Sequence, residues 1–105
     1  MGGPRKRVML RRLCLSLSEE QLDWARRSAP DGNVSKLLRR LVREGLTDWD
    51  ALPPDVRPSA DERARYVINV DEEFDLMLRM CYATRGERPS SLFRRCIDRA
   101  RTLEG

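Results

Sequence analysis

The sequence contains no histidine, which removes the most frequent general base and a common metal ligand. It also lacks a glycine-rich phosphate loop, a paired-carboxylate pattern and a nucleophile motif. These absences argue against an enzyme. We therefore expect no catalytic residue, no metal and no cofactor.

Cysteine is scarce and odd in number, with only Cys14, Cys81 and Cys96, and their spacing fits no zinc site. Reduced thiols in an intracellular protein are the expected state, with two of the three packed in helices. No apolar run is long enough to cross a membrane, and the N-terminus lacks a signal-peptide pattern. We expect a cytoplasmic protein of a bacterium, phage or archaeon with no membrane partner.

Lysine is nearly absent: of the 21 basic residues, only Lys6 and Lys36 are lysines, and the others are arginines. Residues 1–46 carry 11 basic and 5 acidic side chains, residues 47–64 carry 2 and 5, and residues 65–105 carry 8 and 7. The basic first part favours a polyanionic partner, and arginine suits nucleic acid through its forked contacts. An arginine preference in a GC-rich genome explains the composition equally well.

A strand that runs directly into a helix occurs twice in the chain. Residues 11–17 alternate apolar and polar, and Ser18 followed by Glu-Glu-Gln is typical of a helix start with a capping box. Residues 65–70 alternate in the same way, and Asp71 followed by Glu-Glu starts a second helix. The junctions lie 53 residues apart, which indicates an internal duplication.

Each of these units continues into a further helix. The pattern predicts helices over about 19–29 and 34–46 in the first copy, and over about 72–84 and 89–103 in the second. The expected buried residues of the second copy are Phe74, Met77, Leu78, Cys81 and Tyr82, then Leu92, Phe93, Cys96, Ile97, Ala100 and Leu103.

Two segments lie outside the copies. Residues 1–7 form a flexible basic arm that either touches phosphates through Arg5, Lys6 and Arg7 or is a solvated tail. Residues 47–64, acidic and rich in proline, form a partly extended linker that acts as a solubilising spacer. Its Trp49 and Leu52 are expected to pack against the end of the preceding helix.

One strand and two helices cannot form a stable domain alone, because the strand edges and the leucine face have no partner. Copy 1 (8–46) and copy 2 (65–105) solve this together in one compact domain. The predicted fold is mainly α, with a two-stranded antiparallel β-ribbon over four helices. The outer face of the ribbon then carries Arg12, Cys14, Ser16, Arg65, Val67 and Asn69. Such a ribbon fits the DNA major groove.

The strand, the Ser-Glu-Glu helix start, the glycine turn and the Leu-Leu-Arg-Arg helix resemble the ribbon-helix-helix repressors of the Arc, MetJ and CopG type. There two chains form the dimer, whereas this chain resembles a fused version, an intramolecular pseudo-dimer similar to TraY-type proteins. The resemblance implies that the six outer residues read bases. It also implies phosphate contacts at the start of the second helix of each copy. With the arm and neighbouring residues, the expected phosphate contacts are Arg5, Lys6, Arg7, Arg11, Asn33, Val34, Ser35, Lys36, Arg88, Ser90 and Ser91.

The side chains support these roles to different degrees. Arg12 and Arg65 can each fork onto a guanine, worth roughly 1–3 kcal/mol of discrimination, and Val67 can press on a thymine methyl group. Cys14 departs from the family, which more often has threonine there. The second copy departs as well, because Pro89 has no amide hydrogen to donate.

The expected function is sequence-specific binding of double-stranded DNA by a nucleoid-associated transcriptional repressor, with repression of its own promoter as one form. An accessory DNA-binding protein of conjugation or of a mobile element is the alternative. A third is an antitoxin. It is less favoured because the chain stops about where the last helix ends, without a tail for a toxin partner. We expect a monomer in solution, with cooperative binding on DNA left open, and a non-palindromic site because the two strands differ.

Overall fold

The computed structural model describes residues 10–104, which form a mainly helical protein with four α-helices and one two-stranded antiparallel sheet. The elements in chain order are β1 (Arg11–Ser18), α1 (Glu19–Ser28), α2 (Val34–Leu46), β2 (Arg63–Val70), α3 (Glu72–Arg85) and α4 (Pro89–Glu104). Short 3₁₀ turns at Pro30–Gly32, Trp49–Ala51 and Ala60–Glu62 join them. No helix within residues 10–104 is long and apolar enough to cross a membrane.

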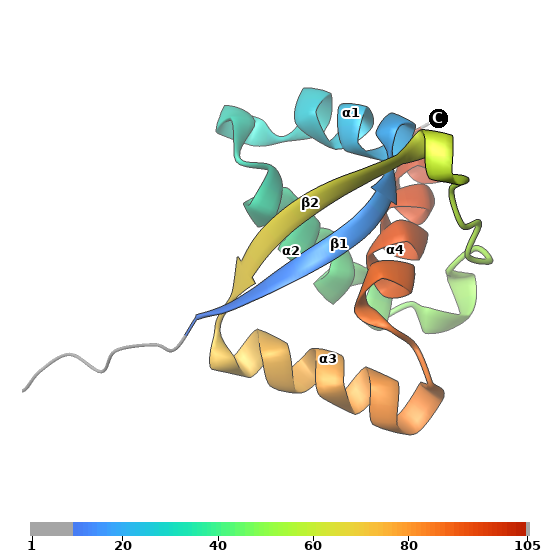
Figure 1. Ribbon diagram of the computed structural model, residues 1–105. Helices are drawn as coiled ribbons and strands as arrows, with labels where there is room; N and C mark the ends of the chain where they lie inside the picture. Colours follow the sequence, from blue (N-terminus) through green and yellow to red (C-terminus); the bar gives the residue numbers. More distant parts are fainter. Residues whose placement is uncertain (1–9, 105) are drawn as a thin grey trace, which may run out of the picture.

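The two strands pair with each other along their whole length, as the sequence predicted. Arg11 lies opposite Val70 at one end and Ser18 lies opposite Arg63 at the other. In Figure 1 the ribbon crosses the front of the molecule, with α1, α2 and α4 behind it and α3 beyond one end. The ribbon therefore has one face on the helices and one face turned outward.

The core forms between the inner face of the ribbon and the helices. Leu15 and Leu17 of β1 and Ile68 of β2 are completely buried, and the leucine face of α2 and the middle of α4 are buried as well. Phe74 and Phe93 pack with ring centroids 6.2 Å apart and connect the start of α3 to α4. The alternation in both strands thus fixes which residues enter the core.

The helix starts follow from local capping. The Ser18 hydroxyl accepts a hydrogen bond from the amide of Gln21, whose side chain accepts one from the amide of Ser18. Asp71 caps α3 and Asn33 caps α2 through their side-chain oxygens. These predicted starts are confirmed. Gly86 ends α3 in the left-handed conformation, with φ of 68°.

Several burial predictions are wrong. Tyr82 is exposed, because it lies on the side of α3 that faces away from the core, under the guanidinium of Arg88. Leu103 is exposed as well, since Ala100 is the last residue of α4 that packs on the core. The prediction that Leu52 of the linker packs on the end of α2 is confirmed. Its side chain is buried and lies so close to Gly45 that a Cβ atom added there would be 3.2 Å from it.

Candidate nucleic-acid interface

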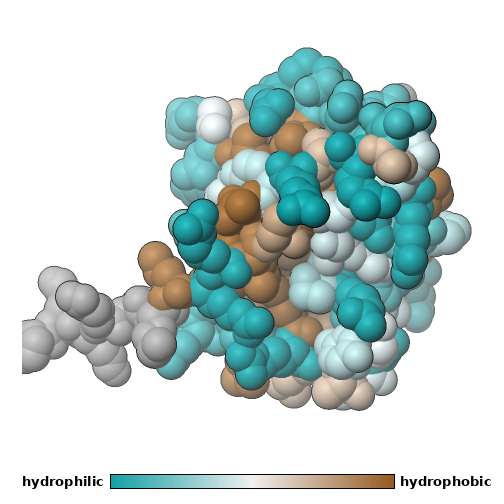
Figure 2. All heavy atoms as spheres, viewed as in Figure 1, coloured by the Kyte–Doolittle hydropathy of each residue, from teal (hydrophilic) through white to brown (hydrophobic). Residues whose placement is uncertain are grey.

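The outward face of the ribbon brings together the six side chains that the alternation placed there. They form three cross-strand pairs, Arg12 with Asn69, Cys14 with Val67, and Ser16 with Arg65. Ser16 is half-buried and the other five are exposed. In the space-filling view, hydrophilic residues cover much of this face and hydrophobic ones show between them (Figure 2). The face is therefore a row of short and long polar groups around one valine.

The order of the pairs gives the face a regular arrangement. The pair of Cys14 and Val67 lies at the centre, and an arginine stands at each end, Arg12 on β1 and Arg65 on β2. Directly opposite side chains in an antiparallel sheet have Cβ atoms about 4.5–5.5 Å apart. Each end of the ribbon thus presents a guanidinium beside a short polar side chain, Asn69 at one end and Ser16 at the other.

The guanidinium groups of these two arginines are available for a ligand. Among residues 10–104, neither Arg12 nor Arg65 takes part in an ion pair. Arg11 differs, because its Nη1 lies 3.2 Å from Oδ1 of Asp75. The structure thus separates Arg12 and Arg65 from Arg11, whose charge is partly compensated within the fold.

The start of α2 lies against the end of β2. The Ser35 hydroxyl oxygen lies 2.6 Å from the phenol oxygen of Tyr66, and Nη1 of Arg39 donates to the backbone oxygen of Asn69 over 2.9 Å. Asn33 caps the amide of Lys36, and the side chain of Lys36 is exposed. Val34 is buried and offers only its backbone.

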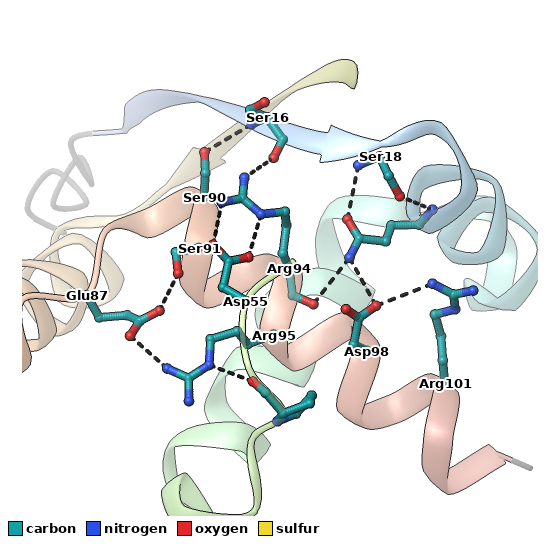
Figure 3. Close-up of polar contacts among 12 residues, drawn as sticks. Ser16, Ser18, Asp55, Glu87, Ser90, Ser91, Arg94, Arg95, Asp98 and Arg101 are labelled. Atoms are coloured by element: carbon teal, nitrogen blue, oxygen red, sulfur yellow. Dashed lines mark hydrogen bonds and ion pairs between the residues drawn. The ribbon is translucent and has the colours of Figure 1, made fainter. Parts of the chain in front are cut away.

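The start of α4 holds β1 in a similar way. Oγ of Ser90 accepts a hydrogen bond from the amide of Ser16 over 3.0 Å, and Nη1 of Arg94 donates to the backbone oxygen of Ser16 over 2.6 Å. Both contacts use the edge of β1 that faces away from β2 (Figure 3). The edge of this strand is therefore covered by a helix, which removes a free edge for further strand pairing.

The contacts of Arg39 and Arg94 are reciprocal. Arg39 of α2 binds β2, and Arg94 of α4 binds β1. Their acceptors, Asn69 and Ser16, are separated by the same 53 residues as the two helix caps. The helical pattern puts both arginines on the charged outer side of their helices, but Arg94 is buried, with 6% of its surface exposed.

Asp55 of the linker completes the site of Arg94 and was missed in the sequence. Its two carboxylate oxygens accept from Nε and Nη2 of Arg94 over 2.7 and 2.8 Å (Figure 3). This hydrogen bonding from Arg94 holds the pKa of Asp55 below its ordinary value, against the opposing effect of burial. The partly extended spacer expected over residues 47–64 would leave such an acid in solvent. The linker instead supplies the counter-charge of a buried arginine.

A second acid lies at the start of α4. Glu87 accepts a hydrogen bond from the Ser91 hydroxyl, and its other oxygen lies 2.7 Å from Nη1 of Arg95. Arg95 also donates to the backbone oxygen of Pro53. The beginning of α4 therefore already has its own carboxylates as partners, whereas the beginning of α2 carries Lys36 and Arg39 beside its capped amides.

Gln21 links α1 to α4 and, like Arg94, is a buried polar residue, with 3% of its surface exposed. Its side-chain nitrogen, Nε2, donates to Oδ1 of Asp98 over 3.0 Å, and its side-chain oxygen, Oε1, accepts from the backbone amide of Ser18 in the helix cap (Figure 3). Arg101 pairs with the same Asp98 oxygen. The capping pattern predicted the local contact of Gln21 but not its second partner, which lies 77 residues further along the chain.

The remaining candidates are distributed as follows. Arg5, Lys6 and Arg7 lie outside the described residues. Cys81 and Cys96 are free and buried, as predicted, and burial raises the pKa of both thiols, that of Cys96 to about 12. Within residues 10–104, no group of cysteine, aspartate and glutamate side chains is arranged to hold a metal ion.

Comparison of the chain with models of known protein families, with characterised proteins and with solved structures found no match. The candidate interface is therefore argued from its own geometry.

Proposed function

We propose that this chain is a single-chain ribbon-helix-helix protein that binds double-stranded DNA by inserting its β-ribbon into the major groove. The observation that carries the proposal is the outer face of the ribbon, where six side chains of both strands form three exposed or half-exposed pairs. The fold uses the opposite face for its core and leaves this one free. A two-stranded ribbon matches the width of the major groove.

The proposal treats the two copies as halves of a pseudo-dimer. The reciprocal contacts of Arg39 and Arg94 support this, because each helix holds the strand of the other copy at the equivalent residue. The pair of Cys14 and Val67 would then lie on the pseudo-twofold axis, since these residues are separated by the same 53 positions as the helix caps. In a homodimer the same contacts would join two chains.

Each ribbon residue then has a role that fits its chemistry. Arg12 and Arg65 fork onto guanine O6 and N7 near the two ends of the ribbon, and Asn69 pairs with an adenine. Val67 contacts a thymine methyl group at the centre. Each strand has an arginine at the equivalent position, but the other outer residues of the two strands differ. The preferred DNA site is therefore non-palindromic.

Phosphate contacts position the ribbon without reading sequence. The start of α2 suits this role, because Lys36 is exposed and helix amides and the helix dipole favour an anion. The start of α4 suits it less, since Glu87 and Asp55 lie close to it. The phosphate contacts at the start of α2 are accordingly stronger than those at the start of α4.

The biological role that follows is transcriptional repression, in which the bound protein excludes polymerase from a promoter. An accessory role in conjugation or in a mobile element uses the same surface and is the alternative. The genomic positions of the preferred sites distinguish the two roles.

Selection of bound sites from a random duplex pool tests the proposal. At about 0.15 M salt, where nonspecific phosphate attraction is weakened, we expect one enriched, non-palindromic motif. Arg12→Ala and Arg65→Ala should each lose roughly 1–3 kcal/mol of discrimination at a different end of that motif. Arg27→Ala, an exposed arginine on α1, is the matched control and should leave affinity and motif unchanged. An unchanged motif in both ribbon variants would refute base reading by the ribbon.

A further inference from the structure

The outer side of α3 carries exposed apolar side chains. Leu76 is 58% exposed and Met80 is 57% exposed, one turn apart on the same side of the helix. With the partly buried Met77 they line a shallow hollow that also includes Leu46 of α2. We call Leu76, Met77 and Met80 the α3 face. These neighbouring side chains form a small exposed apolar patch, and the apolar patch of a monomer is often functional.

The first copy holds charged residues at the corresponding positions of the repeat. Counted from the capping residues Ser18 and Asp71, Leu76 corresponds to Asp23 of α1 and Met80 corresponds to Arg27. Both residues of α1 are exposed and charged. The two helices have the same place in their units, so the fold does not require apolar residues on the outside of α3.

No described element covers the α3 face. In Figure 1, α3 lies at the bottom of the molecule, below the ribbon, α1 lies at the top, and α2 and α4 lie between them. Its buried residues, Phe74, Leu78 and Cys81, point the other way into the core. The apolar side chains of the face are thus left for a partner outside the described chain.

The charges around the face fit a second copy of the same helix. The first turn of α3 is acidic, with Glu72 and Glu73, and its last turn carries Arg85. When two α3 helices pack antiparallel, Leu76 of one lies opposite Met80 of the other, and the acidic turn of each lies near Arg85 of the other. The helix dipoles also oppose each other in this arrangement. The surface is therefore complementary to itself, as a closed twofold contact requires.

We propose that the α3 face is a self-association surface through which two copies of this chain form a symmetric dimer. The contact is separate from strand pairing, because each chain already completes its own ribbon. One helix face buries much less than the roughly 800 Å² per partner of a standard interface. The dimer is therefore weak, and the chain is a monomer when dilute.

Sedimentation equilibrium of the free protein tests this, from about 10 µM to about 1 mM chain. The average mass should rise from 12.2 kDa toward twice that value as the concentration increases. The variant L76D/M80R gives α3 the two residues that α1 has at the corresponding positions, Asp23 and Arg27. The fold already tolerates these residues on the outside of α1. It should stay at the mass of one chain throughout. Val56→Asp, which changes an exposed apolar residue of the linker, is the control and should associate like the wild type.

Two further outcomes decide the geometry. Glu72→Lys together with Glu73→Lys should weaken association, and the effect should shrink at high salt because surface charges are screened. A wild-type mass that stays at one chain up to about 1 mM would overturn the proposal. So would association that survives in L76D/M80R. Neither result depends on DNA, so a failure here is distinct from a failure of the proposed function.

Discussion

The contact between Asp55 and Arg94 makes a quantitative prediction about the linker. Asp55→Asn keeps the size of the side chain and removes the charge that neutralises Arg94, whose side chain is only 7% exposed. Arg94 would keep its hydrogen bond to the backbone oxygen of Ser16. The substitution therefore isolates the contribution of the linker to the position of α4.

The expected loss in the free energy of unfolding is about 3 kcal/mol, because removing one partner of a buried ion pair leaves the other charge uncompensated. This is the lower end of the usual range, since the Asp55 side chain keeps 17% of its exposure. Urea denaturation followed by circular dichroism measures this loss. Asp48→Asn is the control, because Asp48 pairs with Arg99 over 3.1 Å but is 51% exposed. It should lose less than about 0.5 kcal/mol.

The pH dependence gives an independent check on the same contact. The hydrogen bonds from Arg94 lower the pKa of Asp55 from its ordinary value of 3.8. The folded state therefore stabilises the charged carboxylate of Asp55. The stabilisation is complete above that ordinary value and is lost as the pH falls through the lowered pKa. The difference between wild type and Asp55→Asn should be constant near neutral pH and should shrink below about pH 4.

Two results would refute this reasoning. One is a loss no larger than that of the Asp48→Asn control at neutral pH. The other is a difference that stays constant when the pH falls to about 3, which would show that the effect does not come from the charge. Either result would return the linker to the role of a spacer.

Three further predictions concern the glycines and the thiols. Gly45→Ala should lose roughly 1–3 kcal/mol, because the new Cβ would lie 2.5 Å from Sγ of Cys96, and adding Cys96→Ala should recover part of the loss in urea denaturation. Gly86→Ala should lower the free energy of unfolding by about 1–2 kcal/mol, since φ there is +68°; an unchanged value would contradict the strain. Alkylation followed by mass spectrometry should label the exposed Cys14 quickly and the buried Cys81 and Cys96 slowly, and duplex carrying the selected site should protect Cys14 if the ribbon enters the groove.

Much of the fold could be predicted because its signals are local. The alternation in both strands assigns each side chain to one face of the ribbon, and the caps at Ser18, Asn33 and Asp71 fix where three helices start. Duplication then suggested that the two strands pair, since each would otherwise have two open edges. The alternation also placed the six outer residues on one face, whereas the register that sets Cys14 opposite Val67 comes from the structure.

The polar contacts behind the ribbon could not be predicted in the same way. Gln21, Asp55 and Arg94 find their partners 39 to 78 residues away, and nothing in the local pattern sets such a distance. The helical pattern of apolar and charged residues assigns every arginine to the solvent side of its helix. A long arginine side chain can nevertheless be buried when it has a partner. One signal was present, because an Arg-Arg pair recurs at the same place in both copies. A repeated charged residue at a repeated position indicates a shared structural role.

The pairing of β1 with β2 has a consequence for synthesis. The two strands are the only sheet among residues 10–104, and the partner of β1 begins at Arg63, long after β1 ends at Ser18. No short hairpin connects them, so the ribbon is a contact between distant parts of the chain, which slows folding. At about 5–20 residues per second, the ribosome needs roughly 3–10 s to proceed from the end of β1 to the end of β2. During that interval β1 lacks its partner strand, and its unpaired edge is open to pairing with another chain.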